Sequence, residues 1–316
     1  MTDKYAVIGT PISHSKSPQI HKMFAQQTGQ DISYGAILAP LDGFAATVER
    51  LRKEGYKGCN VTVPFKFEAF QSATQLSERA QAANAVNTLK FDDDTFFGDN
   101  TDGAGLVRDI ENNLGFPLKG LRVLLMGAGG ATYGAVLPLL DAGVKLSVVN
   151  RTIKKARQLG EAFAAQGHIA VFGYADLDGK TFDCVINATS SGLSGEMPPL
   201  PRGDTIPLSP PFAKGEVWVP TSVNGEVMAP PFVNGEAKVP PFVKGGLGGI
   251  FAPGALAYEM MYGKETPFMK FAREQGAAIV TDGLGMLVEQ AAESFSIWRG
   301  VRPDTAPVIS ALRQHQ

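Results

Sequence analysis

Short apolar strand patterns alternate with amphipathic helix patterns along most of this chain, and this alternation restricts the folds open to it. In the first hundred residues, "YAVIG" (5–9), "SYGAILA" (33–39) and "GCNVTVPFK" (58–66) are typical of strands, and a helix pattern follows each of the first two. "AVNTLKF" and "TFFGDN" predict a late strand pair around residues 92–94. Strands and helices that alternate at these lengths predict a parallel sheet covered by helices.

A second unit of the same kind begins near Gly105. "LRVLLMGAGGATYGAVLPLLDAG" predicts a buried strand, a glycine turn and an apolar helix, and "KLSVVNRT" and "FDCVINATSSG" predict later strands. An amphipathic pattern over residues 285–298 predicts the helix that closes the chain. With 316 residues, there is room for two packed domains of roughly 150 residues each. We therefore expect two α/β domains separated by a cleft.

Composition and charge exclude several classes of function. The 29 basic and 31 acidic residues give a net charge of −2, which offers no electrostatic attraction to nucleic acid or to an anionic membrane. No apolar run reaches the roughly 18 residues of a membrane span, and the first residues lack the pattern of a signal peptide. Cys59 and Cys184 suit a reducing compartment and fit neither a disulfide framework nor a zinc site. These features predict a cytoplasmic protein without a metal centre, and they leave a monomer and a homodimer open.

A proline-rich repeat interrupts the alternation. From residue 211 the chain reads PFAKGEVWVP, TSVNGEVMAP, PFVNGEAKVP and PFVKGGLGGI, and 12 of its 21 prolines lie between residues 198 and 253. A ten-residue period with this much proline and glycine holds neither a helix nor a long β-ladder. We predict a flexible insertion over residues 204–250. A polyproline segment that binds a partner is the alternative.

The glycine turn "VLLMGAGGA" is typical of a dinucleotide site. Gly127 permits a tight turn, and Gly129 lets the backbone approach a pyrophosphate at the positive end of the following helix. Thr132 departs from the strict fingerprint, which has Gly or Ala at that position. Such glycines also suit a plain tight turn, but the order strand, turn, helix and strand favours the nucleotide-binding interpretation.

The end of the next strand indicates which dinucleotide binds. An NAD site has Asp or Glu about 20 residues after the turn, which accepts hydrogen bonds from the ribose 2′-hydroxyl. This chain has "NRTIKK" instead, with the cations Arg151 and Lys155 and no acid. A guanidinium and an ammonium bind a 2′-phosphate, which an acid would repel. We therefore predict NADP; the alternative is that Thr152 only caps a helix and the basic side chains are solvated.

Polar residues gather where the strands of the first sheet end. Ligands of open α/β sheets lie outside the carboxyl ends of the strands. The candidates at those ends are Ser15, Ser17, Asn60, Thr62, Lys66, Asn87 and Asp102. Each has a simpler explanation on its own, and Ser17 could be the N-cap of a helix that begins with Pro18. Together they predict a small ligand rich in hydroxyl groups, because buried polar groups need partners.

Lys66 and Asp102 are the chemically distinctive pair in this group. A lysine near a substrate carbonyl supplies a positive donor where oxyanion charge develops as a hydride adds. A neighbouring carboxylate holds the lysine in place, and the pair can pass a proton in either direction. A purely structural ion pair is the alternative interpretation.

Eight motifs, taken in chain order, resemble those of the NADP-dependent shikimate dehydrogenases: "PISHSKSP", "NVTVPFK", "NAVNT", "GDNTDG", "GAGGA", "NRT", "NATSSG" and "DGLGMLVEQA". The resemblance covers nearly the whole chain except residues 204–250. It implies an N-terminal substrate domain over residues 1–104, with residues 285–316 packed back onto it, and a Rossmann-type NADP-binding domain over residues 105–284. It also implies the reversible reduction of 3-dehydroshikimate to shikimate with NADPH, in the pathway to chorismate and the aromatic amino acids.

The resemblance also implies roles for individual positions. Lys66 and Asp102 would be the catalytic pair beside the reacting C3 oxygen. The residues implied to bind substrate, with the first two on its carboxylate, are Ser15, Ser17, Asn60, Thr62, Asn87, Tyr262 and Gln290. The residues implied to bind NADP are Gly127, Ala128, Gly129, Gly130, Ala131, Asn150, Arg151, Thr152, Lys155, Thr189, Gly283 and Met286.

The chain departs from the family pattern at several places. Lys155 stands where many relatives have a second arginine, Tyr133 replaces a basic residue, and Glu259 replaces the more usual aspartate. The proline-rich insertion enters near the nicotinamide side of the expected cleft, and we expect activity to survive it. One alternative is an NAD-dependent quinate/shikimate dehydrogenase, which would carry an acid where "NRT" stands. Another is a catalytically silent NADP-binding regulator, which would lack Lys66 or Asp102.

Overall fold

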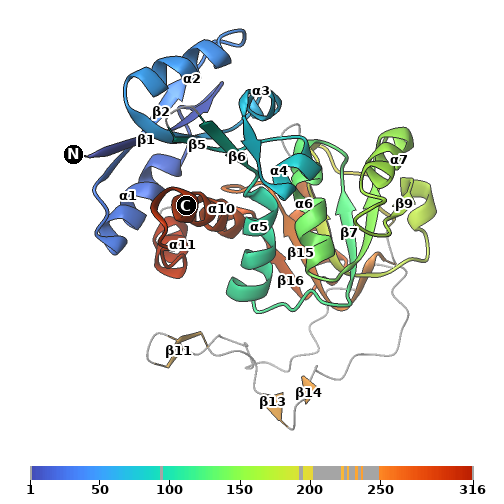
Figure 1. The fold of residues 1–316 in the computed structure, drawn as a ribbon. Helices are drawn as coiled ribbons and strands as arrows, with labels where there is room; N and C mark the ends of the chain where they lie inside the picture. The colour runs from blue at the N-terminus through green and yellow to red at the C-terminus, as the bar shows by residue number, and fades with distance from the viewer. Residues whose placement is uncertain are drawn as a thin grey trace.

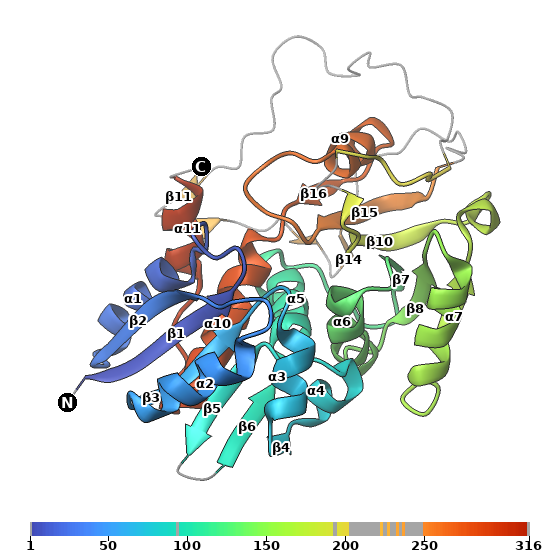
Figure 2. The ribbon, with the colours of Figure 1, turned by 90° about the horizontal axis from the view of Figure 1, so that it is seen from above.

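The computed structural model describes residues 2–92, 95–191, 195–201 and 249–314, together with four two-residue strands between residues 222 and 237. Two six-stranded sheets form the framework of the molecule. Figures 1 and 2 both show the blue N-terminal strands on one side, the green-to-orange second sheet on the other, and helices α5 and α10 between them. The expected arrangement of two α/β sheets is therefore confirmed.

The N-terminal sheet has the strand order β2-β1-β3-β5-β6-β4. Its strands are β1 (Asp3–Gly9), β2 (Ile32–Leu38), β3 (Tyr56–Val61), β4 (Gln75–Leu76), β5 (Thr88–Asp92) and β6 (Thr95–Asp99). β1 pairs in parallel with β2 and β3, whereas β5 runs antiparallel to both β3 and β6. The expected parallel arrangement is confirmed for β1, β2 and β3 and is wrong for β5, because β5 and β6 follow one another too closely for a crossover connection.

Four helices belong to this half of the chain, and a fifth leads out of it. They are α1 (Ser17–Thr28), α2 (Phe44–Lys53), α3 (Lys66–Ser72), α4 (Glu78–Ala83) and α5 (Asp102–Arg108). α5 continues directly into a π-helix, Asp109–Asn113. The core of this half includes Ile8, Phe44, Leu51, Phe65 and Leu89, which are fully or almost fully buried. Four of these side chains come from strands and covering helices, as the alternating pattern predicts, and Phe65 lies in the turn just before α3.

The second sheet is parallel throughout and has the order β16-β15-β10-β7-β8-β9. Its strands are β7 (Arg122–Met126), β8 (Lys145–Val149), β9 (Ala170–Phe172), β10 (Phe182–Asn187), β15 (Phe251–Glu259) and β16 (Ile279–Thr281). The associated helices are α6 (Gly130–Asp141), α7 (Ile153–Ala162), a 3₁₀ turn at Tyr174–Leu177, and α9 (Pro267–Glu274). This is the Rossmann order 3-2-1-4-5-6 read from the other edge. From β7 the chain adds β8 and β9 on one side, and from β10 it adds β15 and β16 on the other. The strand order therefore reverses between β7 and β10, so a ligand crevice is expected at their carboxyl ends.

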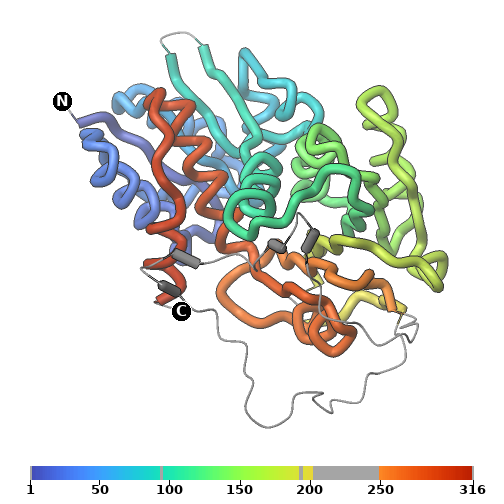
Figure 3. Tube along the Cα trace, turned by 90° about the horizontal axis from the view of Figure 1, so that it is seen from below, coloured from blue at the N-terminus to red at the C-terminus, as the bar shows by residue number. Residues whose placement is uncertain are grey.

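The C-terminal segment crosses back to the N-terminal half. Helix α10 (Leu284–Arg299) packs against α5 and α1, and Ile20 and Phe24 of α1 share a buried cluster with Val288 and Phe295 of α10. Figure 3 shows this red helix beside the blue N-terminal helix. A further helix, α11 (Ala306–Arg313), follows it, so the expectation that the helix over residues 285–298 closes the chain is wrong.

The predicted insertion at residues 204–250 lies outside the described residues, except for residues 249–250 and four short strands. β11 (Ser222–Val223) pairs antiparallel with β12 (Glu226–Val227), and β13 (Phe232–Val233) pairs in the same way with β14 (Glu236–Ala237).

Among the residues that are described, no helix is long and apolar enough to cross a membrane. Cys59 and Cys184 are buried free thiols, and burial raises the pKa of both.

Candidate active site

A cavity of about 420 Å³ lies between the two halves of the molecule. The strand order explains its place, because the winding of the N-terminal sheet reverses between β1 and β3, just as that of the second sheet reverses between β7 and β10. The predicted site residues that line it are Ser15, Ser17, Asn60, Thr62, Lys66, Asn87, Asp102, Ala131, Tyr262, Gly283, Met286 and Gln290. All nine predicted catalytic and substrate-binding residues thus border one cavity.

Lys66 and Asp102 form an ion pair on the wall of this cavity. Lys66 is the first residue of α3 and Asp102 is the first residue of α5, so each follows the carboxyl end of a strand. The Lys66 Nζ atom lies 2.5 Å from Asp102 Oδ2. The Lys66 side chain keeps 25% of its surface exposed, and that of Asp102 keeps 12%. The acid also lies at a helix N-terminus, where the helix dipole favours negative charge.

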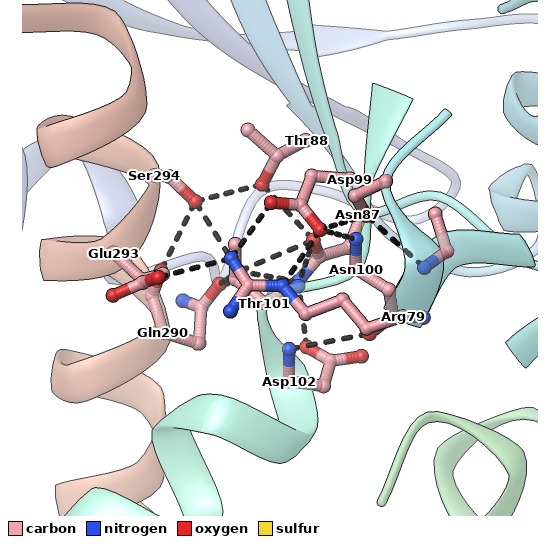
Figure 4. Close-up of polar contacts among 12 residues, drawn as sticks. Arg79, Asn87, Thr88, Asp99, Asn100, Thr101, Asp102, Gln290, Glu293 and Ser294 are labelled. Carbon is pink, nitrogen blue, oxygen red and sulfur yellow. Dashed lines mark hydrogen bonds and ion pairs between the residues drawn. The ribbon is translucent and has the colours of Figure 1, made fainter. Parts of the chain in front are cut away.

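The second oxygen of the Asp102 carboxylate is held by Asn87. The Asn87 amide donates from Nδ2 to Asp102 Oδ1 at 2.8 Å and to Thr101 Oγ1 at 2.9 Å. Its carbonyl oxygen accepts from the Thr101 backbone N–H and from the Thr88 hydroxyl, both at 2.9 Å. Figure 4 shows these contacts converging from β5 and the start of α5. Because every polar atom of the Asn87 side chain is engaged, the orientation of the carboxylate is fixed before any ligand arrives.

Asn60 is bound into the same network from the opposite side. Its carbonyl oxygen accepts a hydrogen bond of 2.7 Å from the Tyr34 hydroxyl. Its amide nitrogen donates to Ser294 Oγ at 2.9 Å and Thr88 Oγ1 at 3.1 Å. Burial raises the pKa of Tyr34 well above its ordinary value, so this hydroxyl remains a donor. Ser294 belongs to α10, so the network ties the C-terminal helix to the N-terminal sheet.

Ser15 lies in the loop between β1 and α1, and Ser17 is the first residue of α1. The structure makes Lys16 the N-cap of α1, and no side chain supplies the capping hydrogen bond. The simpler explanation of Ser17 as an N-cap is therefore wrong, because Ser17 is already the first helical residue. The Ser15 hydroxyl accepts a hydrogen bond from the Ser17 backbone N–H at 3.3 Å. Both hydroxyl groups lie on the cavity wall and can donate to a ligand.

Two further predicted residues of the cavity wall, Gln290 and Tyr262, come from the C-terminal third of the chain. Gln290 on α10 accepts 3.4 Å hydrogen bonds from Asn87 Nδ2 and Thr101 Oγ1, and its amide nitrogen donates to the Leu287 carbonyl at 2.8 Å. Tyr262 lies in the loop after β15, and burial raises the pKa of its hydroxyl. Both residues thus bring the C-terminal part of the chain to the cavity wall.

The glycine turn fits a bound pyrophosphate. Gly127 has φ +113°, a left-handed value that favours glycine. A Cβ atom built on either Gly129 or Gly130 would meet nothing within 4 Å, so the backbone there is open to a ligand. Gly129 is the N-cap of α6 and has no side-chain cap, which leaves the first N–H groups of this 12-residue helix for an anion. Thr132 is fully buried behind the turn, where its hydroxyl has no partner among the described residues.

The candidate 2′-phosphate site follows β8. Asn150 donates from its amide to the Thr152 carbonyl at 3.0 Å. Thr152 is the N-cap of α7, but its hydroxyl makes no capping hydrogen bond, so capping alone does not explain it. Arg151 and Lys155 are exposed, and neither has an acidic partner within the described part of the chain. Burial raises the pKa of the neighbouring Tyr174 to about 12, which the charge of Arg151 opposes.

Not every predicted cofactor residue reaches the cavity. Among the described residues, three of the predicted cofactor residues line the cavity that contains Lys66 and Asp102: Ala131, Gly283 and Met286. Thr189 lies just beyond β10, where its hydroxyl donates to Asn187 Oδ1 at 2.7 Å. The other glycine-turn and "NRT" residues lie along the carboxyl edge of the second sheet.

Glu259, one of the departures from the family pattern, is a buried structural acid. Its carboxylate accepts hydrogen bonds of 2.8 Å from the Asn187 amide and the Thr266 hydroxyl, and one of 3.1 Å from the Met261 backbone N–H. Burial raises the pKa of this carboxyl group. The extra methylene of glutamate is accommodated, and the side chain links the ends of β10 and β15 to the start of α9.

Several site residues were not predicted. The cavity is also lined by Val7, Pro11, Ile12, His14, Val61, Met260 and Leu287. Thr88, Thr101 and Ser294 form the network behind the catalytic pair. The position of Thr101 directly before Asp102 was a usable signal, whereas nothing in the local pattern marks Ser294. Within the described residues, no group of three or more acidic, histidine or cysteine side chains is placed to hold a metal ion.

The two sheets, the Rossmann strand order and the ion pair at the shared cavity define the class of two-domain α/β oxidoreductases. Family models identify the branch. A model of the shikimate dehydrogenase substrate binding domain matches residues 7–89, one of shikimate/quinate 5-dehydrogenase matches residues 109–194, and one of the shikimate 5′-dehydrogenase C-terminal domain matches residues 283–313.

Full-length relatives agree with these matches. The chain is 52% identical to a shikimate dehydrogenase (NADP(+)) of Methylobacillus flagellatus, over 98% of this chain and 99% of the relative. It is 51% identical to one of Nitrosospira multiformis, over 99% of this chain and 98% of the relative. The chain belongs to the shikimate dehydrogenase family.

Solved structures give the same fold. An Ael1 enzyme from Pseudomonas putida superposes with a TM-score of 0.80 at 45% identity, over 98% of each chain. A shikimate 5-dehydrogenase from Thermus thermophilus, solved in complex with NADP(H) and shikimate, gives a TM-score of 0.76 at 27% identity over the whole of both chains. The resemblance inferred from the eight sequence motifs is therefore confirmed.

Proposed function

We propose that this protein catalyses the reversible, NADPH-dependent reduction of 3-dehydroshikimate to shikimate, in the cytoplasmic pathway to chorismate and the aromatic amino acids. The observation that carries the proposal is the Lys66–Asp102 ion pair on the wall of a cavity that Ala131 of the cofactor turn also borders. Relatives at about half identity over nearly the full chain are named for this activity. The substrate is a small molecule, and a monomer and a homodimer both satisfy the proposal.

The division of labour follows the two sheets. We assign residues 1–104 and 285–316 to substrate binding and residues 105–284 to NADP binding. The packing of α10 against α1 and α5 supports this division, because it brings Gln290 beside Asn87. The two portions meet at the cavity, so substrate and cofactor approach the ion pair from opposite sides.

The substrate carboxylate is assigned to Ser15 and Ser17. Their hydroxyl groups can donate two hydrogen bonds to a carboxylate without placing a second cation close to Lys66. Asn60, Thr62, Asn87, Tyr262 and Gln290 are assigned to the ring hydroxyls or the carboxylate. Asn60 has both amide hydrogens engaged by protein groups, so it can offer a hydroxyl only the free lone pair of Oδ1.

Lys66 and Asp102 are assigned to the chemistry. When bound, NADPH supplies the hydride for this reduction. The Lys66 ammonium donates a hydrogen bond and then a proton to the C3 oxygen, which becomes an alkoxide-like acceptor as the carbonyl is reduced. Asp102 holds the ammonium at 2.5 Å, and Asn87 holds Asp102. In the oxidation direction, the same pair takes the proton back from the alcohol.

The cofactor is assigned to groups that are open in this structure. The N–H groups at the start of α6 and the turn Gly127–Ala131 would hold the pyrophosphate, and Asn150, Arg151, Thr152 and Lys155 would hold the 2′-phosphate. Thr189, Gly283 and Met286 are assigned to the nicotinamide side. The absence of an acid after β8 separates this chain from the NAD-dependent alternative, and the presence of both Lys66 and Asp102 disfavours a silent regulator.

An oxidation assay with two substrates and two cofactors tests the proposal. Purified protein is supplied with shikimate or quinate and with NADP⁺ or NAD⁺, and formation of the reduced nicotinamide is followed by its absorbance. We expect the highest kcat/KM for shikimate with NADP⁺. Binding of shikimate without any dinucleotide-dependent turnover would overturn the assignment, and preference for quinate with NAD⁺ would transfer it to the alternative enzyme.

A further inference from the structure

A buried carboxylate that the proposed chemistry does not use lies on the same helical face as Asp102. Asp109 is seven residues further along, which is about two turns, so the two acids point in similar directions about 10 Å apart along the axis. Asp109 is 3% exposed and begins the π-helix Asp109–Asn113. Single π-helical turns next to α-helices are frequent at functional sites. A buried carboxylate at this place therefore requires a structural or functional explanation.

The Asp109 side chain is hydrogen-bonded to strand β15 of the second sheet. The hydroxyl of Tyr258, a fully buried residue of β15, donates to Asp109 Oδ2 at 2.6 Å. The same hydroxyl accepts from the Met286 backbone N–H at 3.3 Å. Asn113 donates to Asp109 Oδ1 at 2.9 Å. Burial raises the pKa of both Asp109 and Tyr258. The Tyr258 hydroxyl thus joins three elements: the helix that starts with Asp102, β15, and α10.

The first turn of α10 packs directly on this carboxylate. A Cβ atom built on Gly285 would lie 1.9 Å from Asp109 Oδ1, a distance that no real side chain tolerates. Glycine at position 285 therefore lets the backbone of α10 approach Asp109 as closely as the structure shows. The close contact involves Gly285 and the hydrogen bond involves the N–H of Met286, so two consecutive residues of this turn are fixed.

Met286 is where this arrangement reaches the cavity. Met286 lines the same cavity as Gly283, Ala131, Lys66 and Asp102. We propose that Tyr258 and Asp109 are positioning residues, which fix Met286 and the start of α10 so that the nicotinamide is held at the correct distance from the C3 carbon. This inference rests on the proposed function, since it names the wall against which the cofactor of that reaction packs.

Tyr258→Phe tests the proposal, because it removes one hydroxyl and keeps the ring. The Asp109 carboxylate then loses a donor and the Met286 N–H loses its acceptor. We expect the Kd of NADP⁺, measured by titration calorimetry, to rise about tenfold, while the Kd of shikimate stays within about twofold. The deuterium isotope effect on kcat with NADPH labelled at the transferred position should also rise, because looser positioning slows hydride transfer. Tyr5→Phe is the matched control, since Tyr5 is also a buried tyrosine but stacks on Trp298 away from the cavity.

Asp109→Asn is a second variant, which keeps the shape of the aspartate side chain and removes its charge. Its neutral oxygen still accepts from Tyr258 but more weakly, so the Kd of NADP⁺ should rise about threefold. A Kd for NADP⁺ and an isotope effect that match the wild type in both folded variants would overturn the proposal. Equal losses for shikimate and NADP⁺ would also overturn it, because they indicate a merely structural role. If wild-type protein itself shows no turnover, the proposed function fails instead, and the calorimetric comparison still decides the positioning role. Should Tyr258→Phe fail to fold, Asp109→Asn decides alone.

Discussion

The two sides of the cavity differ in how far their polar groups are already paired. On the substrate side, Asn60, Asn87, Thr101 and Asp102 are buried, and their side chains hydrogen-bond to one another or to neighbouring residues. Figure 4 shows this for Asn87, Thr101 and Asp102. On the cofactor side, Gly129, Gly130, Arg151, Thr152 and Lys155 are exposed, and the helix N–H groups face open space. The buried polar groups of the substrate side thus already hydrogen-bond to other protein groups, whereas the donors of the cofactor side are available to a ligand.

This contrast separates two ways of building a site. A buried network must be complete in the free protein, because an unpaired polar group there would destabilise the fold. Its completeness also sets the geometry of the catalytic carboxylate in advance, which is the condition for electrostatic stabilisation of a transition state. Exposed donors at a helix end and on flexible cations are solvated until a phosphate replaces the water. Substitutions on the first side should therefore change kcat, and those on the second should change cofactor affinity.

Lys66→Ala should give the largest effect and tests the first half of the comparison. Removal of the proton donor is expected to lower kcat by about 10²- to 10⁴-fold, with shikimate affinity changed only a few-fold. Steady-state kinetics in both directions and calorimetric binding of shikimate measure the two quantities. Lys90→Ala is the control, since Lys90 forms only a partly exposed pair with Asp92 at 3.5 Å. Near-normal turnover of Lys66→Ala would contradict the catalytic role.

Arg151→Ala should give the next largest effect and tests the second half. Loss of the guanidinium is expected to weaken NADP⁺ binding about 100-fold, because charge-assisted hydrogen bonds to a phosphate are lost. NAD⁺ binding and the kcat at saturating NADPH should change little. Arg157→Ala, at an exposed arginine of α7, the helix that follows Arg151, is the matched control. A similar loss for NAD⁺ and NADP⁺ would place Arg151 elsewhere than at the 2′-phosphate.

Ser15→Ala should give a smaller effect that crosses the comparison, because it removes a binding group from the substrate side. The hydroxyl contacts the carboxylate equally in ground and transition states, so KM should rise about tenfold while kcat stays nearly constant. The effect is limited because Ser17 remains. A fall in kcat at unchanged KM would show that Ser15 acts on the reacting end of the substrate instead.

Much of the site was predictable because its chemistry lies close to strand ends. Lys66 and Asp102 each follow a strand pattern, and the glycine turn follows another, so the rule that ligands lie at carboxyl ends placed them together. Tyr34 and Ser294 were not predictable. The hydrogen bond from Asn60 to Ser294 spans 234 residues of sequence and depends on α10 packing back across the N-terminal sheet. No local pattern carries that information.

The errors in the fold have a similar origin. Antiparallel β5 and β6 were expected as a strand pair, but their direction within the sheet depends on the pairing of β5 with β3. The last helix, Ala306–Arg313, is short and was overlooked after the stronger pattern of α10. Ser17 seemed suited to cap a helix because it precedes Pro18, yet the helix begins one residue earlier. Local propensity identifies elements here, and tertiary packing decides their ends and partners.

Substitution of His21 should give the smallest effect on activity at neutral pH, and it extends the comparison to stability at acid pH. His21 is fully buried behind the substrate side, stacked on Tyr34 with ring centroids 4.1 Å apart. Neither ring nitrogen has a hydrogen-bond partner among the described residues. Burial lowers the pKa of His21 to about 3 from an ordinary 6.5, and the nearby Asn60 side chain opposes that shift. The folded protein therefore keeps this imidazole neutral where an unfolded chain would protonate it.

The sign of the pH dependence follows from this difference. Below pH 6.5 the unfolded state binds a proton that the folded state does not, so the stabilisation is complete above that pH and is lost as the pH falls toward 3. At about 1.4 kcal/mol per pH unit, the loss between pH 8 and pH 5 amounts to about 2 kcal/mol. His21→Phe should remove that part of the slope in urea unfolding while leaving neutral-pH activity intact, and His168→Gln, at an exposed position, should keep the wild-type slope. Identical slopes for wild type and His21→Phe would mean that the imidazole takes up its proton at the same pH in the folded protein as in the unfolded chain. The region behind the substrate side would then be more open to water than the burial of His21 indicates.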